Sequence, residues 1–351
     1  MDGNHGTAAT DHGSPITDHG PQGRSCPAHY GYSPRVFARR PELVADTIYV
    51  IGGLYGNLPA LDEIEKMAAA EPIRPQLVFN GDFHWFDASE PTFRQIQLRV
   101  LANTRHFALR GNVETEIASD NSEAGCGCAY PPSVPDNEVE RSNAILDRLR
   151  ELARSLRADA DPTRRLLAEL PTHAIALVGD ARIAIVHGDA WSLAGWQFAH
   201  DALFDAGSQA RLDEAFGLSA VDGFASTHTC LPALKRAAAA GRERFIVNNG
   251  AAGMPNFTGT RFGLITRISV RPIPAALDAA RVYGADMAGV YVDAIAVNFD
   301  FDAWRAMFLE IWPQGSDAHR SYFERIVDGP AFTVDDALGR GPNRRCVALA
   351  A

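Results

Sequence analysis

Short apolar runs that end in glycine and then continue into a loop restrict the fold of this chain more than any other feature. Runs of β-branched and aromatic residues of this length, bounded by glycine, are typical of buried strands. In two of them the residue after the glycine is Asp or Asn. The runs and the residues that follow them are 47–51 with Gly52-Gly53, 76–80 with Gly81-Asp82, and 106–110 with Gly111-Asn112.

A helix is expected after the first of these strands. Asn57 suits the N-cap position and Pro59 suits the first turn. The apolar residues that follow share one helical face; they are Leu61, Ile64, Met67 and Ala68. The repeated strand, loop and helix pattern predicts an α/β protein.

The remaining elements fit one elaborated domain over residues 26–330. Residues 1–25 are polar and lack periodic apolar positions, so they are expected to be disordered, and residues 331–351 are assigned to a second tail. A helical insertion is expected around 135–170. A hairpin, further strands and a C-terminal strand with two helices are expected at 174–178 with 182–187, at 223–227, 244–248 and 262–270, and from about 291 onward.

Composition excludes several classes of function. The net charge of −10 and the absence of a dense Lys or Arg run argue against a nucleic-acid partner. The five cysteines are odd in number and irregularly spaced, which favours a reducing compartment over a disulfide framework. Because no long apolar segment and no leader-like run is present, we expect a cytoplasmic protein without a membrane partner. The sequence leaves the oligomeric state open.

Four residues at the ends of predicted strands have side chains that bind divalent metals. Ligands in α/β sheets bind where strands end at their carboxyl edge, since the loops there can bring side chains into one crevice. Two imidazoles, a carboxylate and an amide oxygen suit Mn, Fe, Zn or Co better than Mg or Ca. The four residues are Asp82, Asn112, His187 and His228.

The order of these motifs resembles the signature of the calcineurin-like metallophosphoesterases. The matching segments are Gly81-Asp82, Gly111-Asn112-Val113-Glu114, Val186-His187-Gly188 and Thr227-His228. Residues 247–255 are similar to the glycine-rich segment that follows the last histidine motif in small bacterial members. The resemblance implies a four-layer α/β/β/α sandwich of two mixed β-sheets flanked by helices. It also implies that Asp82, Asn112, His187 and His228 form a complete set of ligands for the second metal of the family, so about one metal is expected per chain.

The first metal site of the family is altered in this chain. Gly53-Leu54-Tyr55 stands where the family has Asp-x-His, and Cys230 stands where it has a second histidine. Tyr55 and Cys230 could form a rebuilt site, with Cys126 and Cys128 brought near by their glycine-rich loop. The alternative is that Tyr55 and Cys230 pack as ordinary buried side chains and that the Cys-x-Cys loop is inert.

The resemblance predicts a metal-dependent phosphoesterase acting on a phosphate mono- or diester. Val113 replaces the usual histidine acid of the family, so His84 is the first candidate for leaving-group protonation, with Glu114 retained nearby. Gly56 and Asn57 would place a helix N-terminus beside the phosphate. The alternative is a non-catalytic pseudo-phosphatase that serves as a binding or scaffolding protein. A third hypothesis is metal sequestration by the Cys-x-Cys loop and the histidine-containing tail.

Overall fold

The computed structural model describes residues 21–121, 123–156, 162–239 and 241–341. Most of the expected N-terminal tail, residues 1–20, therefore lies outside the described part. Residues 21–25 pack against the domain: Gly23 N donates to Ala124 O over 2.9 Å, and Arg24 donates to Val134 O over 2.6 Å. No helix in the described ranges is long and apolar enough to cross a membrane.

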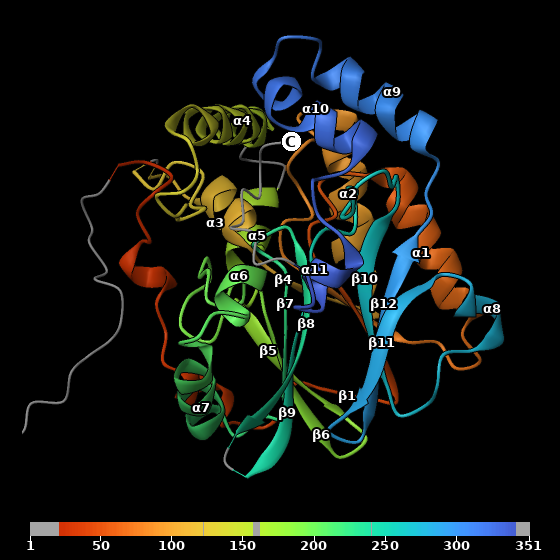
Figure 1. The fold of residues 1–351 in the computed structure, drawn as a ribbon. Helices are drawn as coiled ribbons and strands as arrows, with labels where there is room; N and C mark the ends of the chain where they lie inside the picture. The colour runs from red at the N-terminus through yellow and green to blue at the C-terminus, as the bar shows by residue number, and fades with distance from the viewer. Residues whose placement is uncertain (1–20, 122, 157–161, 240, 342–351) are drawn as a thin grey trace, which may run out of the picture.

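Two six-stranded mixed sheets form the centre of the molecule (Figure 1). The first sheet has the strand order β1 (Leu43–Ala45), β5 (His173–Val178), β6 (Ala181–Val186), β7 (Gly223–Ser226), β9 (Arg242–Asn249) and β8 (Pro232–Ala239). The second has the order β11 (Arg281–Met287), β12 (Val290–Val297), β10 (Gly263–Ser269), β2 (Thr47–Ile51), β3 (Gln76–Asn80) and β4 (His106–Leu109). The strands β2, β3 and β4 are parallel, as are β6, β7 and β9.

The inner core lies between the two sheets. Ile48 and Val50 of β2 pack there with Ile183 and Ile185 of β6, whereas Tyr49 and Ile51 belong to the cluster that includes the apolar residues of α1. All five residues of β2 are buried because both faces of its sheet are covered. A strand buried on both faces reads as a continuous apolar run, which is why the sequence signal of residues 47–51 was strong.

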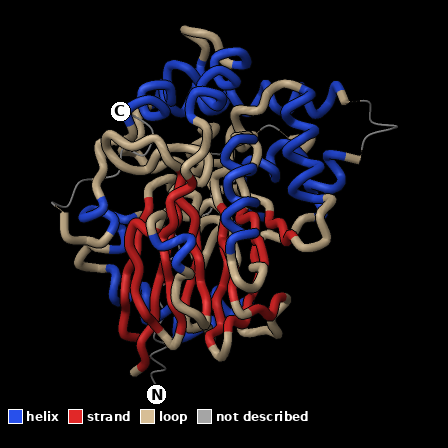
Figure 2. The backbone as a smooth tube through the Cα atoms, turned by 90° about the vertical axis from the view of Figure 1, so that its right-hand side faces the viewer, coloured by secondary structure: helices blue, strands red, loops and turns tan. Residues whose placement is uncertain are grey.

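Helices cover the outer faces of both sheets (Figures 1 and 2). The helices whose apolar residues join the outer core of the second sheet are α1 (Leu58–Ala70), α2 (Glu90–Leu101), α3 (Asn112–Ala118), α4 (Asp136–Ser155), α5 (Thr163–Glu169), α9 (Phe301–Ile311) and α10 (Asp317–Asp328). The first sheet is covered by η2 (Pro34–Phe37), α6 (His200–Leu203) and α7 (Ser208–Ser219). Short helices also occur at η1 (Ala28–Tyr30), α8 (Ala275–Asp278) and α11 (Val334–Ala337). This arrangement confirms the predicted sandwich of two mixed sheets flanked by helices.

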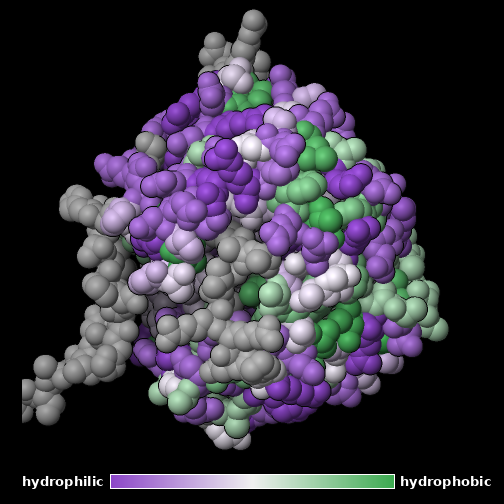
Figure 3. All heavy atoms as spheres, turned by 45° about the horizontal axis from the view of Figure 1, so that its top comes forward, coloured by the Kyte–Doolittle hydropathy of each residue, from purple (hydrophilic) through white to green (hydrophobic). Residues whose placement is uncertain are grey.

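Local predictions near the site agree with the structure. Helix α1 begins after Asn57, whose side-chain oxygen accepts a hydrogen bond from Ala60 N over 2.9 Å, as its N-cap assignment required. Helices α4 and α5 occupy the expected insertion, and α4 lies beside α10 above the strands. Figure 3 shows that the face formed by this end of the molecule is mainly hydrophilic, with hydrophobic residues in small separate patches.

The structure differs from the expected boundary at residue 330. Phe332 and Ala337 are buried in the core between the sheets, and α11 packs with them. The packed domain therefore continues to at least residue 337, because these apolar side chains complete an existing core. Residues 342–351 of the expected second tail lie outside the described part of the chain.

Candidate metal centre

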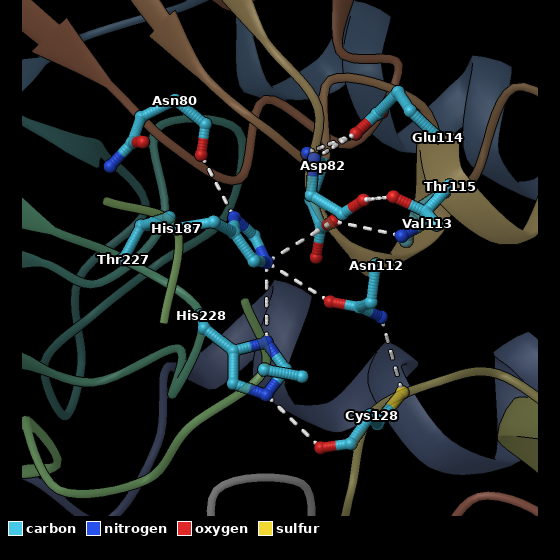
Figure 4. A network of polar contacts seen from close by, with 12 residues as sticks. Asn80, Asp82, Asn112, Val113, Glu114, Thr115, Cys128, His187, Thr227 and His228 are labelled. Atoms are coloured by element: carbon cyan, nitrogen blue, oxygen red, sulfur yellow. Dashed lines mark hydrogen bonds and ion pairs between the residues drawn. The ribbon is translucent and has the colours of Figure 1, made fainter. Parts of the chain in front are cut away.

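The four predicted ligands meet where strands of both sheets end. Asp82 lies two residues after β3, and Asn112 is the first residue of α3, shortly after β4. His187 directly follows β6, and His228 lies two residues after β7. All four side chains are buried. The two sheets thus contribute two ligands each to one buried point (Figure 4).

Gly81 and Gly111 allow the loops that hold these ligands to come together. A Cβ atom on Gly81 would lie 2.5 Å from Gly111 N and 2.6 Å from His187 Nδ1. A Cβ atom on Gly111 would lie 2.2 Å from Asp82 Oδ1. All three distances are far inside van der Waals contact, so glycine is required at both positions for the close approach.

The imidazole of His187 presents a lone pair to the other three ligands. Its Nδ1 lies 2.8 Å from Asn80 O, and because a carbonyl can only accept, Nδ1 carries the proton. The unprotonated Nε2 lies 3.0 Å from Asn112 Oδ1, 3.2 Å from His228 Nδ1 and 3.4 Å from Asp82 Oδ1. Figure 4 shows these contacts radiating from one ring nitrogen.

The orientations of His228 and Asn112 are fixed in the same way. His228 Nε2 donates to Cys128 O over 3.0 Å, which leaves the lone pair of Nδ1 facing His187. The Asn112 amide group donates to Cys126 O over 3.0 Å, so its oxygen faces the site. Four electron-pair donors therefore converge, and burying such a set without a shared cation is unfavourable.

This donor set fits a bound metal ion. Ligand atoms of Asp82, His187 and His228 all lie within 4.8 Å of one another. Each histidine has its other ring nitrogen bonded to a backbone carbonyl, the outer arrangement that holds metal-binding imidazoles in place. Two imidazole nitrogens with carboxylate and amide oxygens suit a first-row transition metal.

Burial and charge affect the two histidines differently. Burial lowers the pKa of His187, but the Asp82 carboxylate outweighs it, and the net pKa is raised above the ordinary value. Burial and then the neighbouring His187 lower the pKa of His228 to about 3. The His228 ring is therefore neutral at physiological pH and keeps its lone pair available.

A small pocket of about 30 Å³ opens beside the ligands. Within the described residues, its lining contains no lysine or arginine, and aromatic side chains form much of its wall. Apart from Tyr55, sequence reasoning missed these aromatic residues because they come from distant segments without a common motif. The lining residues are Tyr55, Asp82, Trp85, Asn112, Val113, Cys128, Tyr130, Trp196, His228, Cys230 and Tyr322.

Comparison with known proteins places this geometry in a known architecture. No protein-family model and no curated protein matches the chain. Among solved structures, a hypothetical protein from Pyrococcus horikoshii OT3 is similar at 17% identity with a TM-score of 0.52, over 83% of this chain and 100% of that chain. Solved structures described as a metallophosphoesterase and as a predicted phosphoesterase are also among the matches. This chain has the two mixed sheets flanked by helices of a metallophosphoesterase sandwich, and Asp82, His187 and His228 converge where its strands end.

Two further neighbours have lower structural similarity. A metallophosphoesterase from Sphaerobacter thermophilus has 17% identity and a TM-score of 0.44, over 75% of this chain and 93% of that chain. Vps29 from Entamoeba histolytica, solved as a complex with Zn²⁺, has 13% identity and a TM-score of 0.30, over 72% and 99% of the two chains. The identities are low, so the likeness concerns the fold.

The two residues that the sequence resemblance aligns with the altered first metal motif, Tyr55 and Cys230, are in contact in this structure. Tyr55 Oη lies 2.9 Å from Cys230 Sγ, and both residues line the pocket. Burial raises the pKa of the Tyr55 phenol well above its ordinary value and also raises the pKa of the Cys230 thiol. A thiol and a phenol bind metals in their deprotonated forms, so a metal at this place would have to displace both protons.

The Cys-x-Cys loop lies against the metal centre, as its glycine-rich composition allowed. Cys128 lines the pocket, and its Sγ lies 3.6 Å from the Asn112 amide nitrogen. Cys126 is buried and is not among the lining residues. The backbone carbonyls of the two cysteines hold Asn112 and His228, a role that no motif in the sequence indicates.

The structure does not bring Glu114 or His84 into the pocket. Glu114 accepts hydrogen bonds from Asp82 N over 2.8 Å, Gly111 N over 2.9 Å and His84 N over 3.2 Å. The His84 ring is fully buried, hydrogen-bonds through Nδ1 to Asp87 Oδ2 over 2.6 Å and stacks on Phe93. Glu114 thus joins the two ligand loops, and His84 sits in the core behind them.

Gly56 and Asn57 also lie outside the pocket lining. Asn57 is buried and donates through Nδ2 to Gly253 O over 2.9 Å in addition to capping α1. A Cβ atom on Gly56 would lie 2.5 Å from Asp87 Cβ, so this glycine permits close packing of the β3 loop. Both residues position the loop that carries Tyr55.

Proposed function

We propose that the chain is a metal-dependent phosphoesterase that uses one transition-metal ion held by Asp82, Asn112, His187 and His228. The observation that carries this proposal is the convergence of four electron-pair donors whose orientations are fixed by backbone partners. Packing alone gives no reason to bury such a set, whereas a cation satisfies all four donors at once.

The residues of the chain bind and orient the components of this site. A bound metal supplies Lewis acidity, which polarises a phosphoryl group and lowers the pKa of a coordinated water. Asn80 and Cys128 hold the two imidazoles through their carbonyl oxygens. Glu114 keeps the Asp82 and Asn112 loops together. The aromatic wall limits the entry of bulk water, which strengthens electrostatic interactions inside the pocket.

The proposed substrate is a phosphate monoester or diester, and the proposed metal is Mn, Fe, Zn or Co at about one ion per chain. Nitrogen and oxygen donors occur together, which suits these metals.

A specific observation favours the alternative of a non-catalytic binding protein. The pocket of about 30 Å³ is walled largely by aromatic residues, and neither His84 nor Glu114 reaches it. Val113 lines the pocket where a histidine acid would stand in the resembling family. A scaffold that keeps its metal for structural reasons would have these properties.

Metal analysis combined with activity measurements tests the proposal. Purified protein would be assayed for Mn, Fe, Co and Zn and tested on p-nitrophenyl phosphate and bis(p-nitrophenyl) phosphate. We expect the wild type to contain about one metal per chain and to hydrolyse at least one of the two esters. Both the metal and the turnover should be lost in His187→Ala. The matched control is His106→Gln, since His106 lies at the opposite end of β4. Metal without turnover favours the scaffold, and absence of metal from a metal-replete preparation refutes the site.

A further inference from the structure

We propose that the Tyr55 phenol binds a phosphoryl oxygen of the substrate by donating a hydrogen bond, in the space left by the missing first metal site. This inference rests on the proposed function for the identity of the ligand. The sequence left two alternatives for Tyr55, a rebuilt metal ligand and an inert packed side chain. The proposed role as a hydrogen-bond donor differs from both.

The ring of Tyr55 occupies the space that a side chain at residue 53 would need. A Cβ atom on Gly53 would lie 2.9 Å from Tyr55 Cζ and 3.0 Å from Tyr55 Oη. Gly53 also has a φ of 64°, which L side chains rarely adopt. An aspartate at residue 53 and the present position of the Tyr55 ring are therefore mutually exclusive.

Backbone strain is concentrated around this phenol. Tyr55, Asp82 and Cys230 have φ values of 55°, 53° and 59°, in the left-handed region that non-glycine residues avoid. All three residues line the same pocket. Tyr55 is held there by a backbone hydrogen bond from its N to Asp82 O over 3.1 Å. Strained residues of this kind persist where the surrounding structure enforces them, and they cluster at ligand sites.

The hydrogen of the phenol is available for a better acceptor than its present one. Tyr55 Oη contacts Cys230 Sγ, and sulfur is a weak acceptor. Two other polar groups of the wall are bonded to oxygen: Tyr130 Oη lies 3.1 Å from Ser142 Oγ, and Trp196 Nε1 donates to Cys128 O over 3.0 Å. A phosphoryl oxygen in the pocket can therefore take the Tyr55 hydrogen at little cost.

The residues that line the pocket favour such a donor. Within the described residues, the lining offers no lysine or arginine to a phosphate group. Asp82 lines the same pocket and repels anions unless a metal neutralises it. Tyr55 is a neutral donor that shares the pocket with Asp82, Asn112 and His228, the residues that would hold a metal, so it is placed to stabilise a phosphoryl oxygen bound there.

Binding of inorganic phosphate to the metal-loaded protein tests this role without requiring turnover. Calorimetric titration would compare wild type with Tyr55→Phe, and metal content and circular dichroism would be recorded for both. We expect unchanged metal content and a phosphate Kd raised about tenfold or more, the effect of losing one hydrogen bond to a charged group. If turnover is present, kcat/KM for bis(p-nitrophenyl) phosphate should fall by a similar factor.

Two further variants separate this role from a structural one. Tyr283→Phe removes another buried tyrosine hydroxyl, which lies in the core between the sheets, and should leave the phosphate Kd unchanged. Cys230→Ala removes the acceptor that competes for the Tyr55 hydrogen, so phosphate should bind at least as tightly as to wild type. This second variant still tests the inference if Tyr55→Phe fails to fold.

Each result of these titrations either supports or refutes the role of Tyr55 in phosphate binding. Wild-type phosphate affinity in Tyr55→Phe, or tenfold weaker phosphate binding in Cys230→Ala, would overturn the inference. Loss of metal from Tyr55→Phe would show that Tyr55 is a metal ligand, which also overturns it. No binding of phosphate by the metal-loaded wild type would refute it as well. If phosphate binds through Tyr55 but neither ester is hydrolysed, the inference stands while the proposed catalytic function fails.

Discussion

The Gly111→Ala substitution tests whether the close approach of the two ligand loops is what creates the metal site. The added Cβ atom would lie 2.2 Å from Asp82 Oδ1, and real Cβ contacts essentially never fall under 3.0 Å, so at least 0.8 Å of movement (3.0 − 2.2) is required. Metal–ligand distances tolerate only about 0.2 Å. The backbone itself accepts alanine, because Gly111 has a φ of −90°. The effect should therefore be steric.

We expect metal affinity to fall by about 10- to 100-fold, the range seen when ligand positioning is disturbed. The free energy of unfolding of the metal-free protein should fall by about 1–3 kcal/mol from overpacking. Competition with a chromogenic chelator measures the first quantity, and urea unfolding measures the second. The matched control is Gly217→Ala within α7, where a Cβ atom meets nothing within 4 Å. It should leave metal affinity unchanged and raise stability by about 0.5–1 kcal/mol. Wild-type metal affinity in Gly111→Ala would refute the geometric reasoning.

Three further predictions follow from the site and the fold. His228→Ala should lower metal content below one ion per chain in elemental analysis while circular dichroism stays the same, since the core does not depend on that ring; full occupancy would show that the site is elsewhere. Glu114→Gln should lower the free energy of unfolding by about 1–3 kcal/mol in urea titrations, because a single amide oxygen cannot accept from Asp82 N, Gly111 N and His84 N together. Burial and then the Arg39 guanidinium lower the pKa of His173 to about 4. The unfolded chain therefore takes up this proton first, so stability is highest above about pH 6.5 and decreases as the pH falls towards 4. His173→Gln should make that decrease shallower in urea unfolding repeated across this range, and an unchanged slope would contradict the assignment.

The sequence predicted the elements that carry the ligands because their signals are local. The continuous apolar run of β2 requires burial on both faces, and the glycines at 81 and 111 mark the turns where the backbones approach. Strand β8 was missed for the opposite reason. Its residues, Pro-Ala-Leu-Lys-Arg-Ala-Ala-Ala, include strong helix formers, yet they form a strand because they pair antiparallel with β9 from Pro232 to Ala239.

The catalytic residues expected near the site also show where local sequence signals are insufficient. His84 was named as a candidate acid and lies two residues from Asp82, and Glu114 was named because it is retained in the Gly111-Asn112-Val113-Glu114 motif. In the structure the His84 ring is hydrogen-bonded to Asp87, and the Glu114 carboxylate of α3 accepts from backbone amides, so neither side chain reaches the pocket. Proximity along the chain predicts a shared loop, but the direction of each side chain depends on the φ and ψ of every residue between.

The sequence by itself determined which side chains are available to bind a metal and at which strand ends they lie, because each motif is a few contiguous residues with a local conformation. Only the tertiary structure decided how those side chains are oriented and what surrounds them. The protonated nitrogen of His187 is set by the carbonyl of Asn80, 107 positions away along the chain. That of His228 is set by the carbonyl of Cys128, 100 positions away. The pocket wall joins segments around residues 85, 130, 196 and 322. Contacts between such distant residues arise only when both sheets and their helices have packed, and no local pattern encodes them.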